Sequence, residues 1–187
     1  MHELDFLIAL GGNASLNGQP VESTINQAVD RLKLEGAKID ALSPFYRTPA
    51  YPPGSGPDFV NAAVAVRLGR SPVEMLELLH EIEADLGRRR IMRWGERTLD
   101  LDLLAAGSTI LPDLQTFEQW RALPTLDQRE QAPDRLVLPH PRLQDRAFVL
   151  VPLFDIAPDW HHPVLNRSVG QMLHDLPEAE RAAILPM

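Results

Sequence analysis

The segment RWGERTLDLDLL, residues 93–104, alternates leucine with aspartate through its second half. Successive side chains of a β-strand point to opposite faces, so the leucines share one face while Asp100 and Asp102 share the other. The alternation therefore predicts a strand with a buried apolar face and a charged face. Such a strand restricts the fold to one that covers the leucines and provides a counter-charge beside the two carboxylates.

The carboxylates of Asp100 and Asp102 need a cation. On one strand face they lie roughly 7 Å apart, and burying them unpaired costs several kcal/mol. Arg93 and Arg97 could neutralise them, and so could a divalent metal. Mg²⁺ takes oxygen ligands, keeps several waters and is usually shared between one or two carboxylates and substrate phosphates. A solvent-facing strand that carries two charges by chance is the alternative interpretation.

The overall composition is that of an ordinary globular protein of one domain. The chain has 187 residues, of which 44% are hydrophobic and 24% charged. A net charge of −8 argues against nonspecific nucleic-acid or anionic-membrane binding, because both depend on cationic surface. The absence of cysteine excludes disulfides and thiolate metal sites. Glu3 and Asp5 stand where a signal peptide needs basic residues, so we expect a cytoplasmic protein without nucleic-acid or membrane partners.

The spacing of apolar and turn residues predicts alternating strands and helices. Ser71, Pro72 and Glu74 form a strong helix start, with serine as N-cap and glutamate able to close a capping box. Gly36 and Gly87 are placed to end the two helices. The order strand, helix, strand, strand, helix, strand is that of a split βαβ unit, so we expect an α+β fold with helices packed on an antiparallel sheet. The expected strands cover residues 4–10, 38–46, 58–68 and 99–104, and the expected helices cover residues 21–35 and 72–86.

Two proline-containing segments interrupt this pattern. Residues 47–58 hold four prolines and two glycines, which exclude regular structure there. Residues 108–134 are longer than a usual loop, so we interpret them as an insertion in a single domain of residues 1–187. The remaining expectations are a short helix between 111 and 123, a short strand at 136–138, a helix at 145–154, a helical tail, and surface positions for His161 and His162.

Arginines are concentrated just before the aspartate strand. Guanidinium groups suit bidentate contact with phosphate, and beside carboxylates that could hold a metal they favour phosphate chemistry. The alternative is a solvated basic loop that neutralises nearby acids. The cluster consists of Arg88, Arg89, Arg90, Arg93 and Arg97.

Three further side chains have both a structural and a ligand-binding interpretation. Trp94 can dock on the protein's own core or stack against a flat aromatic ligand. Asn61 interrupts an apolar strand, so its amide must find hydrogen-bond partners in the protein or in a ligand. His140 lies between two prolines, which hold its ring on a stiff turn.

Several ordered segments together resemble the 6-hydroxymethyl-7,8-dihydropterin pyrophosphokinase family, whose members transfer diphosphate from ATP to a pterin alcohol in folate biosynthesis. The resemblance covers most of the chain and implies a ferredoxin-like α+β fold, an antiparallel sheet flanked by helices. It also implies a monomer that uses two Mg²⁺ ions. The segments are GGN at 11–13, SPFYRTPAY at 43–51, PDFVNAAV at 57–64, RWGERTLDLDLL at 93–104 and LVLPHPRLQDRAFVLVPLFDIAPDW at 136–160.

Carried over by position, the resemblance implies a role for each matching residue. Asp100 and Asp102 hold both Mg²⁺ ions against the ATP phosphates, while Trp94 and Phe148 sandwich the pterin ring. The ATP-binding set is Arg88, Arg97, Arg135, His140 and Arg146. The pterin-binding set is Thr48, Pro49, Tyr51, Phe59, Asn61, Trp94 and Phe148. The catalytic set is Arg88, Arg97, Asp100 and His140.

The implied reaction is in-line attack by the pterin hydroxymethyl oxygen on the β-phosphorus of ATP, with AMP as leaving group. Positioning and charge neutralisation carry most of such a reaction, and Asp100 is the candidate base. The loops at 47–57 and 87–97 are expected to close over both substrates and exclude water. The family often has tyrosine where this chain has Pro141, and no role follows for Arg89, Arg90 or Arg93.

Two other functions remain open on the residues alone. A different Mg²⁺-dependent nucleotidyl or phosphoryl transferase would react at the α-phosphorus and release inorganic diphosphate. A noncatalytic small-molecule-binding α+β module would need no metal and would keep its ligand affinity without Asp100 and Asp102. The identity of the product, or its absence, separates the three.

Overall fold

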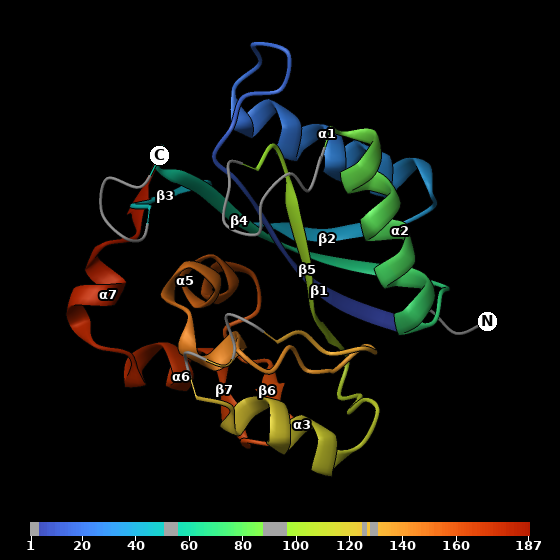
Figure 1. The fold of residues 1–187 in the computed structure, drawn as a ribbon, viewed down its shortest axis with the longest axis vertical. Coiled ribbons are helices and arrows are strands. Elements are labelled where there is room, and N and C mark those ends of the chain that lie inside the picture. The colour runs from blue at the N-terminus through green and yellow to red at the C-terminus, as the bar shows by residue number, and fades with distance from the viewer. Residues whose placement is uncertain (1–3, 51–55, 88–96, 125–126, 128–130) are drawn as a thin grey trace.

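The computed structural model describes residues 4–50, 56–87, 97–124, 127 and 131–187. Six strands form its main sheet: β1 (Leu4–Gly12), β2 (Lys38–Leu42), β3 (Tyr46–Thr48), β4 (Phe59–Leu68), β5 (Asp100–Ala106) and β8 (Leu185–Pro186). The strand order is β5-β1-β4-β3-β8, with β2 also paired to β4 (Figure 1). Every pair is antiparallel, which confirms the expected sheet.

Helices cover both faces of this sheet (Figure 1). One apolar core joins β1, β4 and β5 to α1 (Val21–Leu34) and α2 (Pro72–Asp85). A second core joins the opposite face to α5 (Ala147–Ile156) and α6 (Val169–Asp175). No helix in the described part of the chain combines the length and apolar character needed to cross a membrane.

The two faces of β1 carry side chains of different size. Phe6, Ile8 and Leu10 are buried in the core shared with α1 and α2. The other face carries Leu7 and then Ala9, which pack in the core shared with α5. On that second face the next residue is Gly11, where β1 pairs with Asn61 of β4 and Asp100 of β5, so the apolar face ends there.

Helix ends follow the sequence signals. The Ser71 hydroxyl accepts the Glu74 N–H while the Glu74 carboxylate accepts the Ser71 N–H, so the capping box before α2 is confirmed. Gly36 and Gly87 adopt φ of 89° and 83° after α1 and α2, a conformation that favours glycine. These residues set where each helix stops and the next strand or loop begins.

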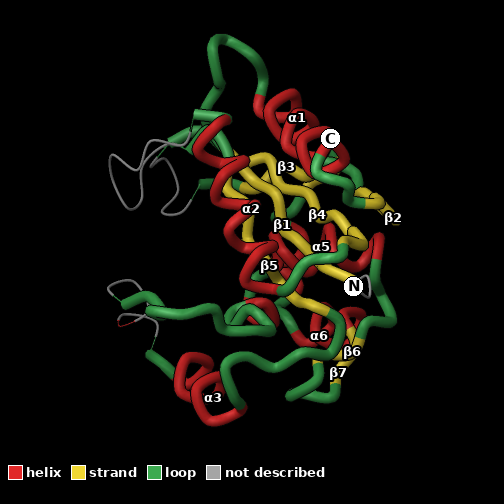
Figure 2. The backbone as a smooth tube through the Cα atoms, turned by 90° about the vertical axis from the view of Figure 1, so that its right-hand side faces the viewer, coloured by secondary structure: helices red, strands yellow, loops and turns green. Residues whose placement is uncertain are grey.

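Part of the chain after β5 forms a group of short elements that lies below the sheet (Figures 1 and 2). It contains the expected helix, α3 (Leu114–Ala122), inside residues 108–134. Two predicted elements are displaced: residues 136–138 form only a single bridge, Leu138 to Leu111, and the predicted helix begins at Ala147 after a 3-10 turn. The other elements are η1 (Leu143–Asp145), β6 (His161–His162), β7 (Arg167–Ser168) and α7 (Glu178–Ala182).

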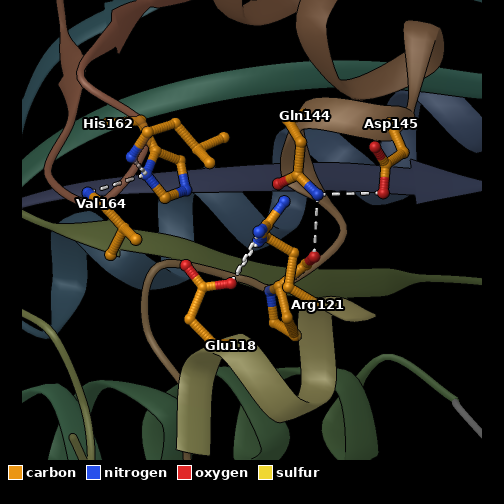
Figure 3. Close-up of polar contacts among 8 residues, drawn as sticks. Glu118, Arg121, Gln144, Asp145, His162 and Val164 are labelled. Carbon is orange, nitrogen blue, oxygen red and sulfur yellow. Dashed lines mark hydrogen bonds and ion pairs between the residues drawn. The ribbon is translucent and has the colours of Figure 1, made fainter. Parts of the chain in front are cut away.

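The surface position expected for His162 is wrong. Its ring is fully buried, 5.5 Å from the ring of Phe117 on α3 and 5.8 Å from that of Trp160. Figure 3 shows it facing the helix that carries Glu118 and Arg121, with Nδ1 accepting the Val164 N–H. Burial lowers the pKa of His162 to about 4. His161, the neighbouring residue, is exposed as expected.

The strand expected at 38–46 is also interrupted. Pro44 has no N–H to donate, and Ser43 closes the gap by accepting the Ala63 N–H on its hydroxyl and donating that hydroxyl to the Pro44 carbonyl. The chain then resumes as β3, so Arg47 and Thr48 lie in a strand that the proline-rich pattern excluded. The break brings Thr48 beside β4, where it becomes part of the candidate site.

Candidate active site

The registers of β4, β1 and β5 place Asn61, Gly11 and Asp100 in one transverse row, or rank, of the sheet. Gly11 of β1 pairs with Asn61 of β4 on one side and with Asp100 of β5 on the other. Side chains of directly paired residues lie on the same face of an antiparallel sheet. Asn61 and Asp100 therefore face the same space, separated by a residue that has no side chain.

Gly11 keeps that space open. A Cβ atom at this position would lie 2.7 Å from the Asn61 Oδ1 atom, well inside ordinary contact. The Asn61 amide thus extends over the backbone of β1 toward the aspartate strand. The next rank, Ala63, Ala9 and Asp102, also carries small residues on β4 and β1.

Arginines supply the counter-charge that the aspartate pair requires. Arg97 Nη1 lies 2.5 Å from Asp100 Oδ2, and Arg146 Nη1 lies 3.6 Å from Asp102 Oδ2. The aspartate side chains keep 24% and 37% of their surface exposed, so both carboxylates stay accessible to a ligand. The prediction that Asp100 and Asp102 share one face, opposite the leucines, is confirmed by the burial pattern of β5.

Arg146 also connects the aspartates to an exposed aromatic ring. It stands at the start of α5, and its guanidinium carbon lies 5.7 Å from the ring centre of Phe148. Partial burial lowers the pKa of Arg146 from its usual value, although guanidinium stays charged at neutral pH. Phe148 keeps 37% of its surface exposed, so its ring is accessible to a ligand.

His140 stands near Arg146 as a neutral hydrogen-bond donor. Burial, reinforced by the positive charge of Arg146, lowers the pKa of His140 to about 3. Its Nδ1 atom accepts the Arg142 N–H at 3.1 Å, so the proton of the neutral ring sits on Nε2. The backbone N–H of His140 donates to the Leu104 carbonyl at 2.8 Å, which ties the turn to β5.

Asn61 receives its orientation from β3. Its Nδ2 atom donates to the Thr48 hydroxyl at 2.8 Å, and β3 pairs Thr48 directly with Phe59. This bond directs Nδ2 to Thr48 and leaves Oδ1 over Gly11. The structural and the ligand-binding interpretations of Asn61 are thus compatible, since only part of its hydrogen-bonding capacity is used.

Asn13 joins the two segments that flank the site, a role that the sequence interpretation missed. It is buried, with Oδ1 accepting the Arg97 N–H at 2.8 Å and Nδ2 donating to the Pro57 carbonyl at 3.3 Å. Its own N–H donates to the Arg97 carbonyl at 2.9 Å. The GGN pattern marks the turn, but only the fold places segments from residues 57 and 97 beside it.

A family model described as 7,8-dihydro-6-hydroxymethylpterin-pyrophosphokinase matches residues 7–158. The chain belongs to this family. A Synechocystis protein named 2-amino-4-hydroxy-6-hydroxymethyldihydropteridine pyrophosphokinase is 37% identical over 171 residues, covering 91% of this chain and 75% of that protein. A Haemophilus influenzae protein of the same name is 36% identical over 153 residues, 81% of each chain.

The fold is that of this pyrophosphokinase family. A solved structure of Plasmodium falciparum HPPK-DHPS matches with a TM-score of 0.66 at 15% identity, covering 92% of this chain and 44% of that one. The chain thus spans less than half of that solved chain, and the likeness concerns the fold alone. It agrees with the ferredoxin-like α+β architecture expected from the resemblance.

Most described residues predicted for the pyrophosphokinase site lie on β3, β4 and β5 or on the turns around them. Thr48, Phe59, Asn61, Asp100 and Asp102 are on the strands themselves. Pro49 follows β3 and is exposed. Arg135 is also exposed, and it pairs with Asp134 at 3.5 Å instead of with Asp100 or Asp102. Tyr51, Trp94, Arg88, Arg89, Arg90 and Arg93 lie outside the described residues.

Proposed function

We propose that this chain transfers diphosphate from ATP to the hydroxymethyl oxygen of 6-hydroxymethyl-7,8-dihydropterin, giving AMP and the pterin diphosphate in folate biosynthesis. Family membership supports this reaction. One structural observation supports the assignment of the site. Asn61, Gly11 and Asp100 form one rank across the sheet, in which the Asn61 amide and the Asp100 carboxylate face the same space. We further propose that residues 1–187 act as one monomeric pyrophosphokinase domain, with residues 108–134 inserted.

The aspartate pair suits Mg²⁺. Within the described ranges, no group of three or more histidines and carboxylates is placed to enclose a metal. Two carboxylates on one strand face instead fit an ion that takes its remaining ligands from water and phosphate oxygens. Asp100 and Asp102 would hold two such ions, which when bound neutralise and orient the phosphate chain.

The cations around the aspartates are the proposed phosphate ligands. Arg97 and Arg146 present guanidinium groups, which match phosphate oxygens in bidentate geometry. His140 adds an uncharged Nε2–H donor on a stiff turn. By family resemblance, Arg88 and Arg135 join this set.

The pterin belongs on the β3 and β4 side. Asn61 offers Oδ1 to a ring N–H, and Thr48 holds the amide in place. Phe148 supplies one aromatic face and Phe59 and Pro49 border the pocket, with Trp94 and Tyr51 added from the resemblance. This arrangement directs the hydroxymethyl group toward β5 and its carboxylates.

The protein's contribution to the chemistry is positioning and neutralisation of charge. The hydroxymethyl oxygen attacks the β-phosphorus in line, and AMP leaves. Arg97 and Arg146 stabilise charge on the transferring phosphoryl groups, while Asp100 is the candidate acceptor of the hydroxyl proton. The loops at 47–57 and 87–97, expected to close over both substrates and exclude water, lie largely outside the described residues.

Product identification tests the proposal. The protein is incubated with ATP, Mg²⁺ and the reduced hydroxymethylpterin, and the products are measured by chromatography and ³¹P NMR. AMP and pterin diphosphate in equal amounts are expected. Release of inorganic diphosphate would instead indicate attack at the α-phosphorus, and ligand binding without turnover would indicate a noncatalytic module.

A further inference from the structure

Glu83 is a buried acid on an otherwise apolar helix face. Only 2% of its surface is exposed, whereas Glu77 and Glu81 on the same helix α2 face solvent. Packing alone does not explain a carboxylate there, because burying a charged group is unfavourable unless hydrogen bonds compensate it. Its Oε1 atom accepts the backbone N–H of Leu101 at 2.7 Å.

The contact matters because the Leu101 N–H lies in β5 between Asp100 and Asp102. β5 is the first strand in the order of the described sheet, so β1 covers one of its edges and α2 lies beside it. Along an antiparallel strand, N–H groups point alternately toward and away from the partner strand. Since the Leu101 N–H goes to Glu83, the N–H groups of Asp100 and Asp102 point toward β1.

Glu83 therefore holds the Asp100–Leu101 peptide from the outer edge. β1 restrains Asp100 and Asp102 from the other edge, through their pairing with Gly11 and Ala9. Rotation of the Leu101 peptide would alter the backbone angles beside Asp100 and change the direction of its side chain. Mg²⁺ requires near-octahedral geometry at short distances, so it tolerates such a change poorly.

We propose that Glu83 is a positioning residue that fixes the orientation of the Asp100–Asp102 pair for its divalent ions. This inference rests on the proposed function, because it assumes that the pair binds metal. In this proposal Glu83 acts through the Leu101 N–H.

Two substitutions separate the acceptor from the charge. Glu83→Gln keeps an oxygen at the same reach and removes the charge, whereas Glu83→Asp keeps the charge and withdraws the oxygen by one methylene. Glu81→Gln and Glu81→Asp are matched controls at an exposed position on α2. The first readout is hydrogen exchange of the Leu101 amide, measured by NMR without metal or nucleotide.

We expect the amide to stay protected in the wild type, in Glu83→Gln and in both controls, and to exchange faster in Glu83→Asp. The second readout is Mn²⁺ affinity, measured by calorimetry with a nonhydrolysable ATP analogue. It should weaken by about tenfold in Glu83→Asp, the usual effect of losing an outer hydrogen-bond partner. The pterin KM should stay unchanged, because pterin binds on the β3 and β4 side.

Two results would overturn the proposal. If Glu83→Gln loses as much metal affinity as Glu83→Asp, the charge and not the acceptor matters. If the Leu101 amide exchanges freely in Glu83→Asp while metal affinity stays at the wild-type value, the contact is merely structural. Failure of the wild type to form AMP would contradict the proposed function, while amide exchange and Mn²⁺ binding would still report on Glu83.

Discussion

Replacing Gly11 with alanine tests whether the absence of a side chain at this position keeps the space between Asn61 and Asp100 open. Alanine would place Cβ 2.7 Å from Asn61 Oδ1, whereas ordinary contact begins at 3.4 Å, so the amide must retreat by about 0.7 Å. That retreat strains the 2.8 Å bond from Asn61 to Thr48. A lost hydrogen bond costs about 1 kcal/mol and overpacking about 1–3 kcal/mol.

The sign of the stability change makes this substitution informative. In an uncrowded strand, alanine is more favourable than glycine by about 0.5–1 kcal/mol. Steric conflict with Asn61 should reverse that gain, so Gly11→Ala should lower the melting temperature by about 2–4 °C for each kcal/mol lost. Displacement of the amide should also raise the pterin KM by about tenfold, which corresponds to about 1.4 kcal/mol.

Calorimetry and steady-state kinetics on Gly11→Ala, Asn61→Ala and the double variant complete the test. In the Asn61→Ala background the obstructing oxygen is absent, so Gly11→Ala should become neutral or stabilising. The steric account is refuted if Gly11→Ala is stabilising in the wild-type background, or if its destabilisation is the same with and without Asn61.

Three further predictions concern other contacts. Asn13→Asp keeps the acceptor for the Arg97 N–H but loses the amide donor, so its melting temperature should fall less than that of Asn13→Ala; equal losses in calorimetry would contradict this. Thr48→Val removes the partner of the Asn61 amide and should raise the pterin KM with little change in the ATP KM, as measured by steady-state kinetics. His162 has a folded-state pKa of about 4, below its usual 6.5, so the unfolded chain binds the extra proton and stability should fall as pH drops from about 6.5 to 4. Thermal melts should show a weaker pH dependence in His162→Gln but not in His161→Gln.

Local signals predicted the elements that they encode directly. The alternation at Asp100 and Asp102 predicted β5 and its two faces, and Ser71 with Glu74 predicted the start of α2. These succeeded because period and capping depend on neighbouring residues only. The break at Pro44 was missed because the apolar pattern on both sides of it continues.

Contacts between segments that are distant in the sequence could not be predicted from such local patterns. The alternation says which residues share a face, but only the pairing register places Gly11 between Asn61 and Asp100. His162 lies in a polar segment, and its burial comes from Phe117 of α3. Glu83 was likewise hidden, because its partner is a backbone N–H that no side-chain pattern reveals.

Arginine and metal are two alternative counter-charges for the same carboxylates, those of Asp100 and Asp102. Arg97 and Arg146 neutralise the aspartates in the structure, yet the proposed reaction directs the guanidiniums to phosphate and the carboxylates to metal. Mg²⁺ and ATP together bring the opposite charge for each group, so partners can be exchanged without leaving an ion unpaired. The partial exposure of these pairs keeps the free-energy cost of breaking them low.

This exchange predicts opposite effects of one substitution on two equilibria. Arg97→Ala should tighten Mn²⁺ binding to the protein without nucleotide, because Asp100 loses the competing guanidinium of Arg97. The same variant should weaken ATP binding and lower kcat by roughly 10²-fold, since a phosphate ligand is lost. Arg97→Lys, which keeps the charge, should leave the nucleotide-free Mn²⁺ affinity close to the wild-type value. Calorimetric titrations with and without an ATP analogue measure both equilibria. Weaker Mn²⁺ binding without nucleotide in Arg97→Ala would mean that the arginine orients the carboxylate for metal instead of competing with it.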